Sequence, residues 1–194
     1  MLNLVTFGCS VTAGFGLNDP DKEAWPAVLS KLMNRNVENK GVSGSSNKEI
    51  LLTILNHKFD HEDIVVVGWT FINRSFLFED RGSIKKIGNW VESDTREKYY
   101  CLHNDYDLYA NTILSIHHAD LFLRTKLKNV LHTHFDTDIT SDKISVPLVQ
   151  SLKIKSLYLP PVFIDYAKDD IHPGPKTHEV IANTINKELY DRKN

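Results

Sequence analysis

Ile64-Val65-Val66-Val67 is a run of four β-branched residues. A β-branched run without polar alternation is typical of a parallel strand that is buried on both faces. Further short segments rich in strand-forming residues lie at 2–7, 36–39 and 130–132. Each of these segments predicts a further strand.

Helical patterns separate these strands. Apolar residues recur at helical spacing within about 24–34, 50–55, 106–128 and 180–189. Ser46 and Glu49 have the spacing of a capping box at the start of the second helix. Strands that alternate with helices predict an α/β fold with a parallel sheet covered on both faces.

Length and composition indicate one ordinary globular domain that spans 1–194. The net charge of −2 provides no general attraction for nucleic acid. No apolar stretch reaches the length of a membrane span, and no signal peptide is visible. Cys9 and Cys101 form neither a disulfide framework nor a zinc set. A cytoplasmic location is therefore expected.

Two short motifs carry the chemistry. Ser10 follows the first strand within Gly8-Cys9-Ser10, and Asp169-Asp170-Ile171-His172-Pro173 lies near the other end of the chain. A serine becomes a nucleophile when a histidine removes its proton, and a third group must orient that histidine. Asp169 lies three residues before His172 and is the expected partner. Cys9 is an alternative nucleophile, although a small apolar residue there is expected to point inward.

Together these motifs resemble the SGNH hydrolase superfamily, also called GDSL-type esterases and lipases. The first block of that family resembles residues 7–16, with Gly-Cys-Ser here in place of Gly-Asp-Ser. The second block resembles residues 39–46, and the last resembles Asp169-x-x-His172. The order of the blocks matches over nearly the whole chain, although the middle third adds little.

The resemblance implies a three-layer α/β/α sandwich with a central, mostly parallel sheet of about five strands, the flavodoxin-like fold of this superfamily. It also implies a catalytic triad of Ser10, His172 and Asp169. The backbone amides of Ser10 and Gly44 would then stabilise the oxyanion. The implied activity is hydrolysis of an acyl or acetyl ester of a small molecule or a glycan, and no metal or organic cofactor is implied.

The third block departs from the family pattern. Gly68-Trp69-Thr70 places a threonine where the family usually has the asparagine of Gly-x-Asn. That asparagine donates to the oxyanion; a threonine hydroxyl can also donate one hydrogen bond, but it reaches less far than an amide. Thr70 is therefore expected to be the weaker third donor.

Residues around Thr70 are the expected substrate-binding residues. Trp69, Asn73 and Arg74 all lie in the loop that follows the strand at 64–67. Ligands of open parallel sheets bind outside the carboxyl ends of the strands, which is where this loop belongs. An arginine at this edge has the geometry to bind a carboxylate or a phosphate. The irregular segment 75–104 follows, and it is either a substrate-facing insertion or a surface excursion.

Two alternative functions remain open. A chain with a threonine at the third block could bind a ligand at the same edge with weak catalysis or none. A metal-dependent hydrolase is the other alternative, because His132, His134 and Asp136 alternate along the chain. Histidine and carboxylate side chains on one face of an extended segment suit zinc. Histidines in a polar loop are the competing interpretation of this segment.

Overall fold

The computed structural model describes residues 3–91, 93–136, 152, 157–159 and 163–191. Its centre is a five-stranded sheet in which every pairing is parallel, in the order β2-β1-β3-β6-β7. The strands are β1 (Asn3–Gly8), β2 (Asn36–Gly41), β3 (Ile64–Trp69), β6 (Asn129–His134) and β7 (Leu157–Tyr158). The α/β prediction with a parallel sheet of about five strands is confirmed.

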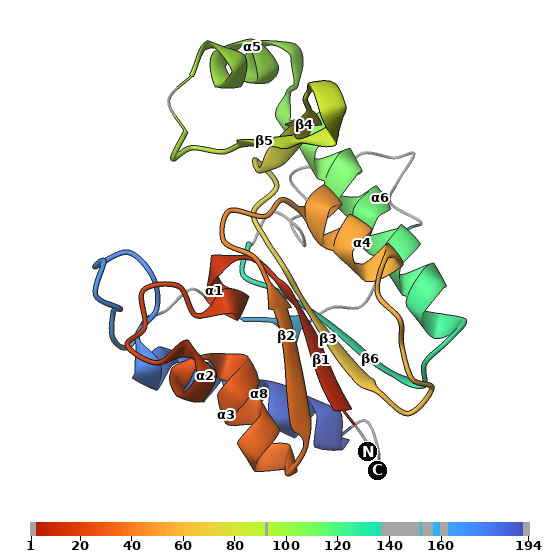
Figure 1. Ribbon diagram of the computed structural model, residues 1–194, viewed down its shortest axis with the longest axis vertical. Coiled ribbons are helices and arrows are strands. Elements are labelled where there is room, and N and C mark those ends of the chain that lie inside the picture. The colour runs from red at the N-terminus through yellow and green to blue at the C-terminus, as the bar shows by residue number, and fades with distance from the viewer. Residues whose placement is uncertain (1–2, 92, 137–151, 153–156, 160–162, 192–194) are drawn as a thin grey trace.

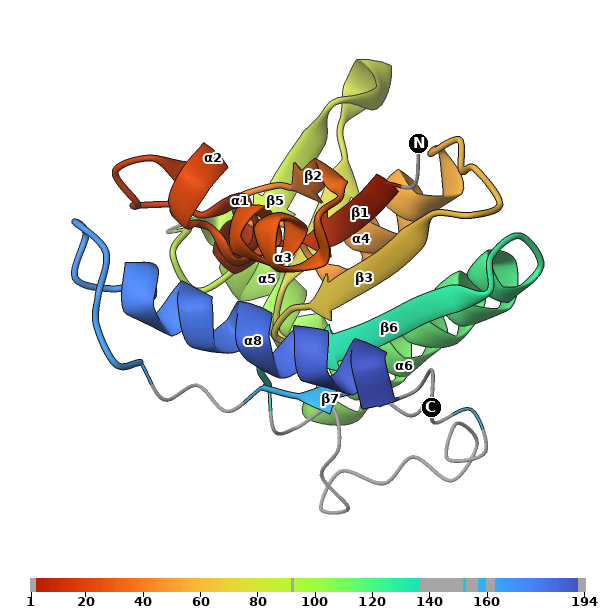
Figure 2. The same cartoon turned by 90° about the horizontal axis from the view of Figure 1, so that it is seen from below.

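Helices cover the sheet on both faces, which gives three layers. Figure 1 and Figure 2 show α3 and α8 on one side of the sheet, and α4 and α6 on the other. The helices are α1 (Ser10–Ala13), α2 (Pro20–Glu23), α3 (Trp25–Met33), α4 (Asn47–Leu55), α5 (Asp94–Leu102), α6 (Asp105–Arg124) and α8 (Pro175–Asp191). The predicted cap of α4 is present, because the Ser46 hydroxyl accepts a hydrogen bond from the Glu49 amide.

The core is divided by the sheet because side chains alternate along each strand. Val65 and Val67 of β3 pack with the apolar residues of α4 and α6. Ile64 and Val66, which point to the opposite face of the sheet, pack with the apolar residues of α3 and α8. Residues 64–69 are all buried, as a central parallel strand requires.

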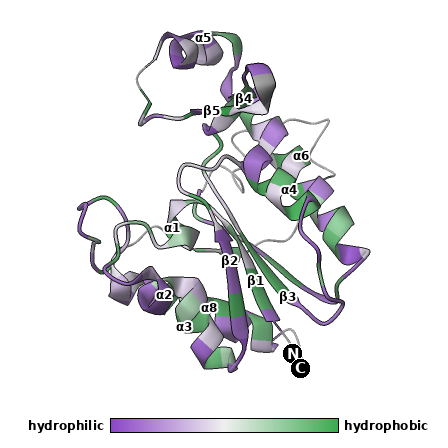
Figure 3. Cartoon of the chain, viewed as in Figure 1, coloured by the Kyte–Doolittle hydropathy of each residue, from purple (hydrophilic) through white to green (hydrophobic). Residues whose placement is uncertain are grey.

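The edge strand β2 is more hydrophilic than its neighbours β1 and β3, as Figure 3 shows. Most of its residues are exposed or half-buried. Among the described helices, none has the length and the apolar composition needed to cross a membrane.

Residues 75–104 form a unit of their own beyond the carboxyl ends of the strands (Figure 1). β4 (Ser75–Phe78) and β5 (Ile84–Ile87) pair antiparallel, with the short helix η1 (Asp80–Gly82) in the turn between them. α5 then leads back to the long helix α6. This unit lies at the end of the sheet where ligands of such folds bind.

Candidate active site

Ser10 begins α1 directly after β1, at the carboxyl end of the sheet. The chain turns sharply here, and a Cβ atom on Gly8 would lie 2.0 Å from the Thr12 hydroxyl oxygen. Only glycine fits this approach. The Cys9 side chain belongs to the buried core on the α3 and α8 side, whereas the Ser10 hydroxyl lies 3.0 Å from Nε2 of His172. The structure therefore pairs the histidine with Ser10.

Asp169 holds the other side of the His172 ring. Its Oδ2 lies 2.5 Å from His172 Nδ1, and its Oδ1 accepts hydrogen bonds from the amides of His172 at 3.0 Å and Ile171 at 3.1 Å. The His172 amide, together with the ring and the Ile171 amide, lowers the pKa of Asp169 to about 2. An ionised Asp169 requires the proton on Nδ1, which leaves Nε2 to accept the Ser10 proton.

The loop that carries this pair is fixed to its surroundings. The Lys168 amide donates to the Gly16 carbonyl at 3.1 Å, and the Ala167 amide donates to the His172 carbonyl at 2.9 Å. Gly16 has a φ of +85° and lies so close that a Cβ atom would be 3.2 Å from Cγ of Asp169. The Phe15 ring lies against the His172 ring, with centroids 5.1 Å apart. The residues after Ser10 thus position the Asp169–His172 loop.

A cavity of about 170 Å³ lies in front of Ser10 and His172. Its other lining residues are Cys9, Val11, Thr70, Phe71, Arg74, Phe135, Phe163, Ile171 and Pro173. The Thr70 hydroxyl is buried and has no hydrogen-bond partner among the residues that the structure describes. The backbone of Thr70, in contrast, forms hydrogen bonds through both its amide and its carbonyl. The Thr70 amide donates to Asn47 Oδ1 at 2.8 Å, and Asn47 Nδ2 donates to the Thr70 carbonyl at 2.9 Å.

The second block is tied to the Ser10 turn, because the Val42 amide donates to the Gly8 carbonyl at 3.0 Å. Gly44 has a φ of +73°, in the left-handed region that favours glycine, and it faces the Trp90 ring. It is not among the residues that line the cavity. The Ser10 amide is the first N–H of α1, a position that has no acceptor within its own helix.

The three predicted substrate-binding residues lie in different environments. Arg74 lines the cavity, whereas Asn73 does not; the Asn73 carbonyl accepts a hydrogen bond from the Tyr100 hydroxyl at 2.5 Å. The prediction for Trp69 is wrong, because its side chain is fully buried in the core. Trp69 is the last residue of β3, and its indole points into the α4 and α6 side of the protein.

The alternative of a metal site at His132, His134 and Asp136 has no support, since no group of three or more potential metal ligands forms among the described residues. Both histidines belong to β6 and are buried, so the polar-loop interpretation is wrong. His132 Nδ1 accepts from the Trp69 indole at 3.0 Å, and its Nε2 faces Asp120 Oδ1 at 3.1 Å. Both ring nitrogens of His132 are therefore occupied.

Asp120 completes this buried network, and no motif in the sequence indicated its contact with His132. Burial opposes its ionisation, but hydrogen bonds from His132 and Arg124 outweigh burial and lower the pKa of Asp120 to about 2. Asp120 lies on the same buried face of α6 as Ile116 and Leu123, at helical spacing from both. A carboxylate on the apolar face of a predicted helix is a signal of such a network.

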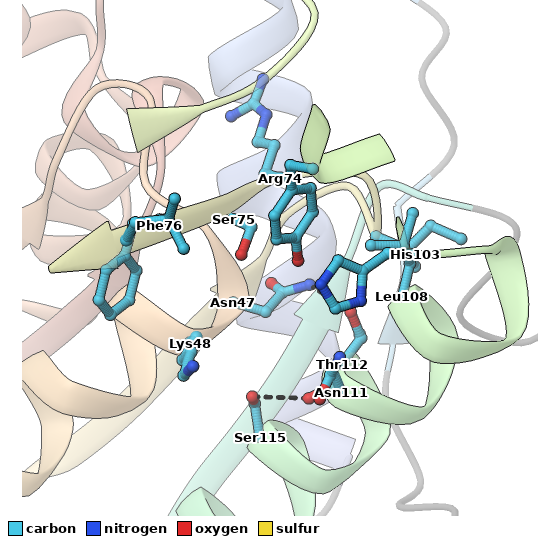
Figure 4. Close-up of a pocket in the computed structure, with 13 residues that line it drawn as sticks. Asn47, Lys48, Arg74, Ser75, Phe76, His103, Leu108, Asn111, Thr112 and Ser115 are labelled. Atoms are coloured by element: carbon cyan, nitrogen blue, oxygen red, sulfur yellow. Dashed lines mark hydrogen bonds between the residues drawn. The ribbon is translucent and has the colours of Figure 1, made fainter. Parts of the chain in front are cut away.

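A second cavity of about 240 Å³ lies between α4, β4 and α6 (Figure 4). It is lined by Asn47, Ser75, His103 and Thr112, among others. Arg74 also lines this second cavity, but Figure 4 shows its side chain extending away from Asn47 and Thr112. The guanidinium therefore lies apart from the polar groups of this second cavity.

No protein-family model and no curated protein sequence matches the chain. Solved structures do match it. The acetyl xylan esterase Est2A from Butyrivibrio proteoclasticus has a TM-score of 0.62 at 15% identity, over 99% of this chain and 64% of that one. A family two carbohydrate esterase from Clostridium thermocellum, in complex with cellohexaose, has a TM-score of 0.58 at 13% identity, over 98% of this chain and 64% of that one.

A third match has nearly the same length as this chain. It is a lipolytic protein of the G-D-S-L family from Veillonella parvula, with a TM-score of 0.54 at 16% identity, over 96% of this chain and 97% of that one. This chain, in contrast, spans slightly less than two thirds of the two carbohydrate esterases. The likeness confirms the fold that the sequence resemblance implies: this chain has the fold of these esterases.

Proposed function

We propose that this protein is a serine ester hydrolase of the SGNH type. The observation that carries the proposal is the continuous contact from Ser10 through His172 to Asp169, which joins residues 162 positions apart in the chain. A hydroxyl within hydrogen-bond reach of a histidine, which is oriented in turn by a carboxylate, is the arrangement that activates a serine. The esterases that share the fold support the same class of reaction.

The proposed reaction has two stages. Ser10 Oγ attacks the ester carbonyl while His172 Nε2 takes its proton, and His172 then gives that proton to the leaving alcohol. Water hydrolyses the acyl-enzyme by the same proton transfers in reverse order. Asp169 orients the ring and stabilises its charged form throughout. The oxyanion would be stabilised by the Ser10 and Gly44 amides and by the Thr70 hydroxyl. The substrate is an acyl or acetyl ester of a small molecule or a carbohydrate.

A fluorophosphonate probe tests the nucleophile. We expect the wild-type protein to be labelled and the label to map to Ser10, because the probe reacts with a serine whose proton is removed by a neighbouring base. Ser10→Ala should not be labelled, whereas Ser83→Ala, which changes an exposed serine in the β4–β5 turn, should be labelled like the wild type. Equal labelling of wild type and Ser10→Ala, or no labelling of folded wild type, would remove the proposal.

Thr70 favours a second candidate function, a ligand-binding protein with weak catalysis or none. The threonine replaces the amide donor that the family pattern has at this position, and loss of one oxyanion donor typically costs about 10²- to 10³-fold in rate. The unpartnered Thr70 hydroxyl at the cavity wall supports the catalytic function instead, because a donor fixed in advance needs no rearrangement. Turnover of any acyl ester would exclude the inactive alternative.

Thr70→Val tests the hydroxyl itself. We expect this change to lower kcat about 10²-fold with a smaller effect on KM, because the hydroxyl would act on the charge that develops in the transition state. The fold should be retained, since Asn47 holds the Thr70 backbone and not its side chain. Thr70→Ser keeps the hydroxyl and should retain most of the activity. Full kcat in Thr70→Val would show that Thr70 is not an oxyanion donor.

A further inference from the structure

Arg74 is a cation in the wall of the Ser10 cavity. Its guanidinium lies over two aromatic rings, 5.0 Å from the centroid of Phe71 and 4.6 Å from that of Trp90. Stacking of this kind uses the faces of the planar guanidinium and does not use its N–H groups, which point outward in the plane. Trp90 comes from the 75–104 unit, so that unit contacts a residue of the cavity wall through Arg74.

The guanidinium lacks a counter-ion within the described part of the chain. No ion pair forms between Arg74 and any described carboxylate, and its Nη1 is buried without a hydrogen-bond partner. Asp169 is engaged with His172, and Asp136 with the Ile72 amide at 3.0 Å. A buried charged donor without a partner is costly, and such a group in a folded protein calls for an explanation.

The backbone that carries Arg74 is fixed. Arg74 closes a turn in which its amide donates to the Phe71 carbonyl at 3.3 Å. Asp136, after β6, holds the Ile72 amide of this turn, and Tyr100 of α5 donates to the Asn73 carbonyl. A guanidinium held by its backbone and by two rings loses little conformational freedom when a ligand binds. The Arg74 guanidinium is therefore fixed in position and has no counter-ion among the described residues, which suits it to bind an anion.

We propose that Arg74 binds a carboxylate of the substrate, so that the hydrolase acts on esters that carry a carboxylate group. The inference rests on the proposed function. Arg74 is the one lysine or arginine among the described lining residues of the cavity. One guanidinium fork matches a single carboxylate bidentately and balances its one negative charge. A doubly charged phosphate would leave a second negative charge that no other described lysine or arginine of the cavity wall balances. Phe135, Phe163 and Ile171 provide apolar contacts for the hydrocarbon part.

Two pairs of esters test the charge preference on each side of the scissile bond. Monomethyl succinate against methyl pentanoate places the carboxylate on the acyl side. Para-acetoxybenzoate, compared with its neutral counterpart methyl para-acetoxybenzoate, places the carboxylate on the alcohol side of the acetyl ester. Hydrolysis is followed by proton release. We expect the wild type to favour the charged ester by about 10- to 100-fold in kcat/KM in at least one pair, as a charged hydrogen bond provides.

The Arg74 variants determine whether this preference belongs to the guanidinium. In Arg74→Gln the charged-to-neutral ratio should fall to near one, and Arg74→Lys, which keeps the charge without the fork, should retain part of it. Lys98→Gln is the matched control. It removes a positive charge from the exposed side of α5 and should keep the wild-type ratio. A wild-type ratio near one in both pairs, or an unchanged ratio in Arg74→Gln, would overturn the inference.

Equilibrium binding separates this inference from the proposed function. Calorimetric titration of monomethyl succinate and para-acetoxybenzoate into Ser10→Ala measures binding without turnover. Tighter binding than in Ser10→Ala/Arg74→Gln supports the carboxylate site even if the wild type hydrolyses none of the four esters, a result that would contradict the proposed function alone. Equal binding by the two variants contradicts the carboxylate site, whatever the turnover.

Discussion

His172→Ala is expected to lower kcat for ester hydrolysis by about 10⁴- to 10⁶-fold, the range seen when the base of a serine triad is removed. Its Nε2 is the group in hydrogen-bond contact with the Ser10 hydroxyl. Without it the serine keeps its proton and attacks poorly. KM should change less than kcat, because the cavity wall loses one ring but keeps its apolar residues and Arg74.

The measurement is steady-state turnover of a short-chain acyl ester by purified variants, with circular dichroism to verify folding. His118→Ala is the control, because His118 is exposed on α6 and should leave kcat unchanged. The fluorophosphonate label should also be lost in His172→Ala although Ser10 is present. A His172→Ala protein that retains kcat within tenfold of the wild type would refute the role of His172 as the base.

The fold was predictable because its signals are local and repeat. Four helical periods between short apolar strands lead to a parallel sheet by connection rules alone. Residues 64–67 are buried on both faces, as four consecutive β-branched residues indicate. The short strand β7 has two residues and follows no comparable run, so no periodicity identified it.

The candidate triad was predictable for a related reason. Ser10 follows a strand and His172 precedes a helix, so both fall at the carboxyl end of the sheet once the strands are parallel. Asn47 was missed because its function is a contact with the Thr70 backbone, 23 residues away, and no local pattern signals such a contact.

The wrong predictions share one cause. Trp69, His132 and His134 were assigned from residue type, whereas their exposure depends on which face of a strand they occupy. His132 and Trp69 satisfy each other across neighbouring strands, with Val67 opposite His132 in the register. The sequence alone does not distinguish a polar residue that belongs to a buried hydrogen-bond network from one that belongs to a functional site. Burial, and not composition, distinguishes the two.

Acid should destabilise the protein well above the pH at which its carboxylates become protonated. His134 and His178 are fully buried, and burial lowers the pKa of each from 6.5 to about 4. Asp136 and Asp165 oppose these shifts without cancelling them. The unfolded chain therefore takes up a proton at each histidine near pH 6.5, whereas the folded protein does so only near pH 4. Stability is fully present above pH 6.5 and falls as the pH decreases toward 4.

The expected loss is about 3 kcal/mol in the free energy of unfolding for each histidine, since one pKa unit corresponds to about 1.4 kcal/mol. Asp120 and Asp169, whose pKa values are about 2, lose their contribution only at lower pH. Urea unfolding at a series of pH values measures the slope. In the wild type, His178 Nδ1 accepts a hydrogen bond from the Trp25 amide at 3.0 Å. In His178→Asn the side-chain oxygen can still accept this hydrogen bond, but asparagine does not titrate.

This variant should lose about half of the pH dependence between pH 6.5 and 4. His61→Asn, at an exposed histidine, should keep the wild-type slope. A His178→Asn protein whose stability falls with acid as steeply as that of the wild type would show that His178 is already charged in the fold. That result would contradict its buried position on α8, where its Nδ1 accepts a hydrogen bond from the first amide of α3. A charged ring has N–H groups on both nitrogens and cannot accept this hydrogen bond.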